Sequence, residues 1–253
     1  MESRFERNIP TISEPEQNTL RDCTAAIIGT GGLGGYAVEF LTRLGIGALI
    51  LCDGDSFSES NLNRQLLAHS GNLGQNKAEA AALRAKLIHP DLPVRVYPCF
   101  LTAENAQEIL KNADIVIDGL DTVSGRLLLE DICTERRLPL VHGAIHGWDY
   151  QAALVDPESK FLHGIYQTGT ENFSSGNSAP EGATAAAFPS DDAPAPETQI
   201  SVLAMTAAFC ASLQCSLALK KLLGRPVQKN TLYYGSVADP SLDSFRSDIL
   251  SVP

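Results

Sequence analysis

The chain lacks any C-x-x-C pair, although it has six cysteines among its 253 residues. Zinc ribbons and thioredoxin-type redox sites both need two cysteines at that spacing, so neither is predicted. Cys210 and Cys215 are five positions apart, which on a helix separates them by roughly 140° and gives a poor geometry for sharing a metal. We therefore expect no zinc site, and mostly buried thiols in a reducing, cytoplasmic setting.

Positive charge is scarce. The 19 Lys and Arg residues stand against 30 Asp and Glu residues, for a net charge of -11 at pH 7. This balance argues against a broad nucleic-acid-binding surface. A phosphate ligand would have to be held by a few local cations and by backbone dipoles. Each Lys or Arg close to a glycine-rich turn is therefore informative.

Long apolar runs of the membrane-spanning kind are also missing. The segment Met1–Arg7 is charged and lacks the apolar run of a signal peptide. Ser201–Leu219 carries no charged side chain over 19 residues, which is long enough to raise a transmembrane interpretation. Its serines, glutamine and many alanines instead predict a buried helix in the core of a soluble protein.

What is present is an alternation of strand-length apolar runs with helix-length segments. This pattern predicts an α/β fold with a Rossmann-like, doubly wound, mostly parallel sheet and antiparallel additions in the C-terminal half. The expected strands are Thr24–Ile28, Ala48–Cys52, Val94–Tyr97, Asp114–Asp118, Leu140–Gly143, Tyr150–Val155 and Asn230–Tyr234. The expected helices are Leu33–Leu44, Lys77–Ile88, a helix capped by Thr102 that runs to about Lys111, Ser124–Arg136, and Gln199–Gly224.

We expect one domain over residues 1–253. It would consist of an N-terminal helical arm (1–23), a nucleotide-binding half (24–145) and a partner-binding half (146–253). Within the last part, Gly164–Thr198 is rich in proline, small residues and acids and has no Lys or Arg. Loops this long usually serve as lids or binding loops, so we expect a crossover loop at about 164–198.

The glycine-rich turn carries the first functional signal. Gly29, Gly31, Gly32 and Gly34 fit G-x-G-x-x-G, directly after a predicted strand and at the start of a helix. Such glycines allow close backbone approach to phosphate, and the helix N-terminus supplies N–H donors. Asp53 ends the next predicted strand, 19 residues after Gly34, where an acid can accept hydrogen bonds from ribose hydroxyls. Together these features predict nucleotide binding.

The fingerprint alone favours NAD, but three further residues favour nucleotidyl transfer. Arg64 and Lys77 follow Asp53 along the chain, and Asp121 leaves the fourth predicted strand at the same edge of the sheet. The two cations can neutralise charge on the α-phosphate and the departing pyrophosphate, and the carboxylate can hold Mg²⁺. Hydride transfer needs none of these groups.

On these motifs the sequence resembles the ThiF/MoeB/HesA adenylyltransferases, relatives of the ubiquitin-activating enzymes. The resemblance runs from about Arg4 to Tyr234. Its strongest parts are Gly29–Gly34, Asp53–Asp55, Ser60–Gln65, Gly74–Lys77 and Asp118–Asp121, supported by Pro139–Ile145 and the late helix that ends at Lys220–Gly224.

The resemblance implies an ATP- and Mg²⁺-dependent nucleotidyltransferase. Such an enzyme adenylates the C-terminal glycine carboxylate of a small, ubiquitin-like sulfur-carrier protein ending in Gly-Gly and releases pyrophosphate. It implies that Asp53 binds ribose with Asp55 and Asn61 nearby, that Arg64, Gln65 and Lys77 contact the triphosphate, and that Asp121 coordinates Mg²⁺. Arg7 lies in an element similar to the family's R-Y-x-R-Q, which implies an arginine supplied to the neighbouring subunit of a homodimer.

The chain also departs from the family pattern. Both C-x-x-C pairs of the family's structural zinc site are missing, and no cysteine occurs from Gly164 to Gln199. Cys210 falls in a predicted buried helix, so we expect adenylation without a covalent cysteine step. The family's D-N-x-x-x-R reads Asp121-Thr-Val-Ser-Gly-Arg126 here. This leaves the role of the Asn open and Arg126 as a candidate for partner recognition.

Three other functions stay open. An NAD-dependent oxidoreductase explains the glycine turn and Asp53 but not Arg64, Lys77 and Asp121. An ATP-dependent dehydratase that modifies transfer RNA shares the motifs of the first half, but the acidic charge and a poor match beyond about residue 145 argue against it. A non-catalytic scaffold could bind a ubiquitin-like protein. The sequence does not name the partner, the pathway or the acceptor of the activated carboxyl group.

Overall fold

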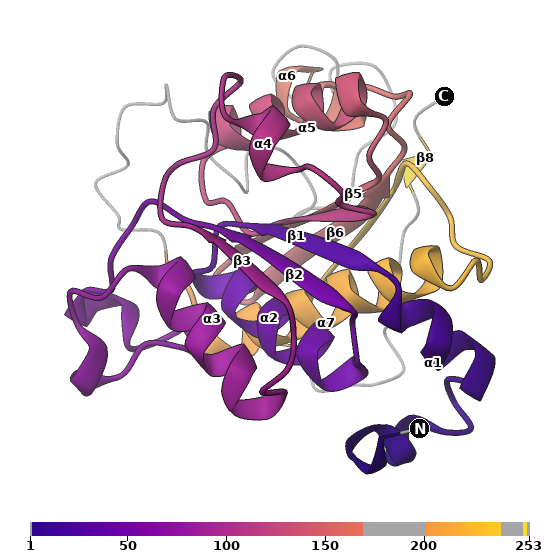
Figure 1. Ribbon diagram of the computed structural model, residues 1–253. Coiled ribbons are helices and arrows are strands. Elements are labelled where there is room, and N and C mark those ends of the chain that lie inside the picture. The colour runs from indigo at the N-terminus through magenta and orange to yellow at the C-terminus, as the bar shows by residue number, and fades with distance from the viewer. Residues whose placement is uncertain (1, 169–200, 239–249, 252–253) are drawn as a thin grey trace.

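A mostly parallel sheet forms the centre of the computed structural model, which describes residues 2–168, 201–238 and 250–251 (Figure 1). The strand order is β3-β2-β1-β4-β5-β6-β7-β8. Strands β1 to β5 pair in parallel, and β6, β7 and β8 are added antiparallel. The strands are β1 Thr24–Ile28, β2 Ala48–Cys52, β3 Val94–Tyr97, β4 Ile115–Asp118, β5 Leu140–His146, β6 Asp149–Val155, β7 Thr231–Ser236 and β8 Leu250–Ser251. The predicted fold class is confirmed.

Helices cover both faces of the sheet, as a doubly wound fold requires. Helices α2, α3 and α7 lie on one face, and α4, α5 and α6 lie on the other (Figure 1). The helical elements are η1 Ser3–Asn8, α1 Glu14–Arg21, α2 Gly32–Leu44, η2 Glu59–Asn61, η3 Ser70–Asn72, α3 Lys77–Ile88, α4 Ala106–Ile109, α5 Val123–Arg136, α6 Phe161–Thr168 and α7 Ala204–Leu222. Within the described residues, none of these helices combines the length and apolar content needed to cross a membrane.

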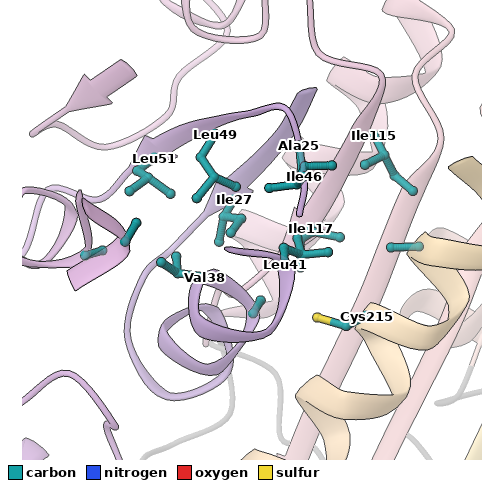
Figure 2. Close-up of a cluster of buried hydrophobic side chains, with 14 of the residues drawn as sticks. Ala25, Ile27, Val38, Leu41, Ile46, Leu49, Leu51, Ile115, Ile117 and Cys215 are labelled. Atoms are coloured by element: carbon teal, nitrogen blue, oxygen red, sulfur yellow. The ribbon is translucent and has the colours of Figure 1, made fainter. Parts of the chain in front are cut away.

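The core has one layer on each face of the sheet. Alternate residues of β1 point to opposite faces, with Ala25 and Ile27 in the layer under α2, and Ala26 and Ile28 in the layer under α5. Figure 2 shows the first layer, in which side chains of β1, β2 and β4 meet α2 and Cys215 of α7. Because both faces of the central strands are buried, their sequences are continuous apolar runs rather than alternating ones.

Several predicted boundaries were wrong. The helix expected from Thr102 to Lys111 is only the short α4, because Thr102 and Asn105 exchange side-chain–backbone hydrogen bonds that form a turn before the helix. The helix ends at Ile109 with Leu110 as its C-cap, and Asn112 beyond it adopts a left-handed φ of 63° that is incompatible with a helix. Strand β5 continues three residues beyond the predicted Gly143, because it pairs with β6 as far as His146.

The predicted start of the crossover loop was also wrong. Gly164 lies inside α6 rather than at the start of a loop. The rest of that loop, 169–198, and the expected start of the late helix at Gln199 lie outside the described residues. Residues 201–203 of that expected helix are not helical, because the Ser201 carbonyl accepts from the Gly147 N–H and Val202 bridges to Gly147. Helix α7 spans only Ala204–Leu222, so the predicted bounds Gln199–Gly224 were wrong.

Candidate nucleotide-binding site

A cleft opens where β1 and β4 lie side by side and their following helices, α2 and α5, leave to opposite faces of the sheet. Ligands of doubly wound sheets bind at the carboxyl ends of the strands at such a switch point. The two chains approach closely there. A Cβ on Gly29 would lie 2.6 Å from the carbonyl oxygen of Gly119, and Gly29 has a φ of 84° that disfavours other residues.

The glycines of the turn differ in their surroundings. A Cβ on Gly34 would lie 1.8 Å from the carbonyl oxygen of Gly29, so this glycine lets α2 pack against the turn. Gly31 and Gly32 line the cleft, and nothing lies within 4 Å of a Cβ built on Gly32. Gly29 also lines the cleft, whereas Gly34 is not among its lining residues.

The cleft has a volume of about 610 Å³, which is in the range of small-molecule sites. One part is lined by apolar and thiol side chains from the ends of β1 and β2 and the segment after β3: Ile28, Cys52, Cys99, Phe100 and Leu101. The other part is lined by glycines and polar side chains: Gly31, Gly32, Arg64, Gln65 and Lys77. Asp53, Asp55, Asp121 and Arg126 also reach the cleft.

Asp53 holds the glycine turn in place. Its Oδ2 accepts hydrogen bonds from the Thr30 backbone N–H at 2.7 Å and the Thr30 hydroxyl at 3.2 Å, and its Oδ1 accepts from the Asp55 N–H at 2.9 Å. The side chain is almost fully buried, with 8% of the residue exposed, yet it lines the cleft. Asp53, the residue predicted to bind ribose, thus also connects the segments that follow β1 and β2.

The two predicted cations lie in the same cleft, on different elements. Lys77 is the first residue of α3, and its Nζ donates to Asp55 Oδ2 at 3.0 Å. Asn76 caps α3 by accepting from the Ala78 and Glu79 N–H groups, and its Nδ2 donates to the Asp53 carbonyl at 2.9 Å. This contact fixes the helix start beside Asp53.

Arg64 is half-buried and lies in the segment after η2. Its Nη1 donates to the Ser60 carbonyl at 2.9 Å and to Asn63 Oδ1 at 3.0 Å. These bonds use one end of the guanidinium. Its neighbour Gln65 lies beside Gly31, because a Cβ on that glycine would be 3.3 Å from Gln65 Nε2.

Asp121 is exposed and lines the cleft just before α5. The next residue, Thr122, is the N-cap of α5, and its hydroxyl accepts from the Gly125 N–H at 3.2 Å. Thr122 therefore caps α5 with its side chain, a role for which threonine is a favoured residue type. The turn before it is held by Asp118, whose Oδ1 accepts from the Leu120 N–H at 2.9 Å.

Besides Gly34, two predicted site residues lie away from the cleft lining. Asn61 is buried within η2, where its Oδ1 accepts from the Ser58 N–H at 3.1 Å. Arg7 lies on η1, beside Phe5, which packs against His89 and Gly45. Gly45 caps the far end of α2, a 13-residue helix whose first turn lines the cleft, so η1 is roughly 20 Å from the cleft of its own chain. Their roles toward the nucleotide stay predictions.

The structure also shows functional candidates that the sequence analysis missed. Phe100 is 64% exposed at the cleft, and its ring lies against Gly54, where a Cβ would be 2.7 Å away. Behind Asp121, His142 and Asp118 form a fully buried pair. The only sequence signal for that pair was a histidine within an apolar strand, since buried polar groups need partners.

Cys210 of α7 is a core thiol. Cys210 is fully buried, as predicted for a core residue, and burial raises the pKa of its thiol to about 12. Such a thiol is a poor nucleophile. Among the residues that the structure describes, no group of three or more His, Cys, Asp or Glu side chains could hold a metal ion.

The sequence profile of the ThiF family matches residues 5–248. SAMP-activating enzyme E1 from Haloferax volcanii is 33% identical over 157 residues, which are 61% of this chain and 58% of that protein. The sulfur carrier protein adenylyltransferase of Thermus thermophilus is 35% identical over 156 residues, 62% of this chain and 57% of that protein. The matched regions thus span less than two thirds of these relatives' own length.

A solved structure matches over more of its length. The E. coli tRNA N6-threonylcarbamoyladenosine dehydratase in complex with AMP has a TM-score of 0.68 and 26% sequence identity. The match covers 87% of this chain and 94% of that chain. The likeness in fold therefore extends beyond residue 145, where a poor match to these dehydratases was predicted.

Proposed function

Because this chain belongs to the ThiF family, we propose that it is an ATP-dependent adenylyltransferase that activates the C-terminal glycine carboxylate of a small ubiquitin-like protein. The observation that carries the proposal is the convergence of Arg64, Lys77 and Asp121 with the glycine turn in one cleft. The sulfur-carrier and SAMP-activating relatives support the class of partner. In this proposal residues 1–253 act as one adenylation domain.

The two parts of the cleft suit different parts of a nucleotide, so they favour one orientation of ATP. The apolar part around Phe100 suits the adenine base, because an exposed aromatic ring offers a stacking surface. Asp53 would accept from the ribose hydroxyls. The triphosphate would then lie against the start of α2, where backbone N–H groups and the helix dipole favour anions, between Arg64, Gln65 and Lys77.

Asp121 fits a magnesium site. Mg²⁺ commonly binds one or two protein carboxylates and completes its shell with phosphate oxygens and water, and Asp121 is an exposed carboxylate at the cleft. When bound, the ion would neutralise charge on the phosphates. The chain's own Lys77 and Arg64 would stabilise the charge that develops as the pyrophosphate leaves.

The reaction needs positioning more than proton transfer. A C-terminal carboxylate is ionised at neutral pH, so one of its oxygens can attack the α-phosphorus without a general base. A bond forms between that oxygen and phosphorus, and the bond from phosphorus to the bridging oxygen of the β-phosphate breaks. The products are an acyl adenylate and pyrophosphate. The site supplies orientation and fixed charge.

The decisive experiment is ATP–pyrophosphate exchange with labelled pyrophosphate, Mg²⁺ and a purified sulfur-carrier protein ending in Gly-Gly. A small protein of this type encoded next to the chain is the first partner to use. We expect exchange with the intact partner, and none with the same partner lacking its last glycine. Arg64→Ala should lower exchange by at least tenfold, since charge-stabilising groups of this kind contribute about 10²–10³ in rate. Absence of exchange with every partner and metal would refute the proposal.

A second candidate is a dehydratase that acts on modified transfer RNA. It is favoured by one observation, the match that covers 94% of the E. coli enzyme's chain. The net charge of -11 opposes it, because RNA binding normally needs a basic surface. Incubating the chain with ATP and transfer RNA carrying threonylcarbamoyladenosine, then analysing nucleosides by mass spectrometry, separates the two: only the dehydratase removes one water from that nucleoside.

Two further alternatives are tested by binding. An oxidoreductase would bind NAD more tightly than ATP, which calorimetry with both nucleotides would detect. A non-catalytic scaffold would bind a ubiquitin-like protein, and its binding would not change in Arg64→Ala or Asp121→Asn.

A further inference from the structure

A buried chain of polar groups lies directly beneath the turn that presents Asp121. Asp118 and His142 are both fully buried, on the adjacent strands β4 and β5, and Asp118 Oδ2 lies 2.7 Å from His142 Nδ1. The other carboxylate oxygen of Asp118 accepts from the Leu120 N–H at 2.9 Å. Each oxygen of Asp118 thus has a partner, one on β5 and one on the turn.

Donor and acceptor counting assigns the state of His142. A carboxylate only accepts, so Nδ1 must carry the proton that Asp118 Oδ2 accepts. Nε2 then accepts, and Tyr166 Oη lies 3.2 Å from it with Gln151 Nε2 at 3.3 Å. Burial lowers the pKa of His142, the nearby Asp118 raises it and Arg126 lowers it. The imidazole is therefore neutral, with one defined tautomer.

Tyr166 links His142 to Arg126, which lines the cleft. Its oxygen accepts from Arg126 Nη1 at 3.3 Å and from Gln151 Nε2 at 3.0 Å, which leaves its own O–H to donate to His142 Nε2. Arg126 is buried but lines the cleft, and its Nη2 donates to the Leu120 carbonyl at 2.9 Å. Both peptide groups of Leu120 are thus held, the N–H by Asp118 and the carbonyl by Arg126.

Leu120 immediately precedes Asp121, so its two peptide groups set the direction in which Asp121 leaves the strand. We propose that His142 and Tyr166 are positioning residues that orient Asp118 and Arg126, and through the Leu120 backbone fix Asp121 against the nucleotide. The inference rests on the adenylation function proposed above. Tyr166 belongs to α6, so the geometry of Asp121 would depend on a helix that packs against α5.

Helix α6 is itself anchored to the helix that carries Arg126. Glu130 of α5 is almost fully buried, and it accepts from the Leu162 N–H at 2.7 Å and the His163 N–H at 3.0 Å, at the start of α6. His163 Nδ1 lies 2.6 Å from the same carboxylate. The two helices therefore hold Arg126 and Tyr166 in a fixed relation. Arg126 Nε has no hydrogen-bond partner in this network and lies 3.9 Å from Asp118 Oδ2, so Arg126 is held through its two terminal nitrogens.

Kinetics with a hydroxyl deletion test the positioning role. Tyr166→Phe removes the donor to His142 and the acceptor of Arg126 while keeping the ring. We expect about a tenfold lower kcat in ATP–pyrophosphate exchange and a several-fold higher Mg²⁺ concentration for half-maximal rate, as for groups that orient metal ligands. The KM for the partner should change less than twofold. Tyr150→Phe is the matched control, since Tyr150 is a largely buried tyrosine of β6 outside this network, and should behave as wild type.

Substitutions of His142 separate the hydrogen bond from simple packing. His142→Asn retains an N–H donor toward Asp118, so it should keep more of kcat than His142→Leu, which leaves the Asp118 carboxylate buried and unpaired. If Asn and Leu lower kcat equally while both fold, or if Tyr166→Phe leaves the Mg²⁺ dependence unchanged, the proposal is wrong.

A measurement independent of activity distinguishes this inference from the proposed function. In protein labelled with ¹⁵N-histidine, the NMR signals of His142 are assigned as those that disappear in His142→Asn. In the wild type at pH 7 these signals should show a neutral imidazole with its proton on Nδ1. Tyr166→Phe should shift the Nε2 resonance of His142. Calorimetry should also show a smaller gain in ATP affinity from Mg²⁺ in Tyr166→Phe than in wild type. An Nε2–H tautomer would overturn the network even in an active enzyme. If the His142 signals are as expected but no ATP–pyrophosphate exchange occurs, the proposed adenylation is refuted and the hydrogen-bond network is not.

Discussion

Gly32 and Gly34 both lie in the first turn of α2, directly after the glycine turn, but their surroundings differ. A side chain on Gly34 would overlap the backbone of Gly29, with 1.8 Å between its Cβ and the carbonyl oxygen. A side chain on Gly32 would meet nothing within 4 Å. The same motif therefore contains one glycine required by packing and another that only faces the cleft.

We predict that Gly34→Ala is destabilising and Gly32→Ala is not. The overlap at Gly34 involves backbone atoms that cannot move aside, so the free energy of unfolding should fall by about 1–3 kcal/mol or more. Alanine at the helical position 32 should be neutral or stabilising by up to about 1 kcal/mol. Urea unfolding of the two variants checks this, and equal stability would contradict the packing argument.

At the scale of elements, α1 and α5 each begin with a side-chain cap. Helix α1 begins with a capping box between Ser13 and Glu16, and Glu16 also forms a two-pronged ion pair with Arg225 in the segment after α7. Helix α5 begins at Thr122, directly after Asp121. The cap of α1 thus also contacts the segment after α7 through Glu16. The cap of α5 lies at the cleft, next to Asp121.

Thr122 should be replaceable by Asn but not by Ala. Asn is as good an N-cap as Thr or better, whereas Ala leaves the helix N–H groups without a side-chain acceptor and costs about 1 kcal/mol. We expect Thr122→Asn to keep the melting temperature and the exchange rate of wild type. Thr122→Ala should lower the melting temperature and the affinity for Mg²⁺ATP, because the cap fixes the residue after Asp121. A melting temperature as high as wild type in Thr122→Ala would argue against the cap.

The Glu16–Arg225 pair should make α1 sensitive to acid. The Arg225 guanidinium and the Ser13 donors lower the pKa of Glu16 to about 2, from an ordinary value of 4.5. The folded-state pKa is depressed, so the stabilisation is present above about pH 4.5 and is lost as the pH falls toward 2. Glu16→Gln should therefore melt below wild type at pH 7, with a difference that shrinks between pH 4.5 and pH 2. Glu14→Gln, in the same turn, is the control and should show no such trend.

At the scale of the whole molecule, the cleft and the N-terminal arm lie at opposite ends of α2. Arg7 is exposed on η1, and Phe5 of the same element packs near Gly45, where α2 ends. An arginine there is too far from the cleft of its own chain to touch the nucleotide. A contribution of Arg7 to catalysis thus needs a second copy of the chain.

Mixed dimers test this arrangement. We expect Arg7→Ala and Arg64→Ala each to lower the exchange rate at least tenfold alone, because every site would lack one arginine. In a mixed dimer, the Arg64→Ala subunit would donate its intact Arg7 to the other cleft, so one of the two sites is complete. Random mixing should restore about a quarter of the wild-type exchange rate if the arm crosses a closed two-fold interface. No recovery on mixing would show that Arg7 does not act between subunits.

Most of the fold was readable from local pattern. The apolar runs of β1, β2 and β3 were predicted at their observed bounds. So was α3, because its segment is rich in alanine and His89-Pro90 stops the helix. The short α4 was not predicted at its observed bounds, because Thr102 and Asn105 form a hydrogen-bonded turn where the helix was expected to begin. Residues of the cleft that follow strands at the same sheet edge, such as Asp53 and Asp121, were also predictable from topology alone.

The sequence by itself determined the class of fold, the glycine turn and the set of charged residues near it, because each depends on short-range spacing and on which end of a parallel strand a residue follows. Tertiary structure decided which glycine is required by packing, that Thr122 serves as a cap, and that Arg7 lies far from its own cleft. It also decided the pairing of Asp118 with His142 and of Arg126 with Tyr166, 24 and 40 residues apart. Such pairs form only when separate strands and helices are packed together, and no local pattern encodes which buried polar groups will meet.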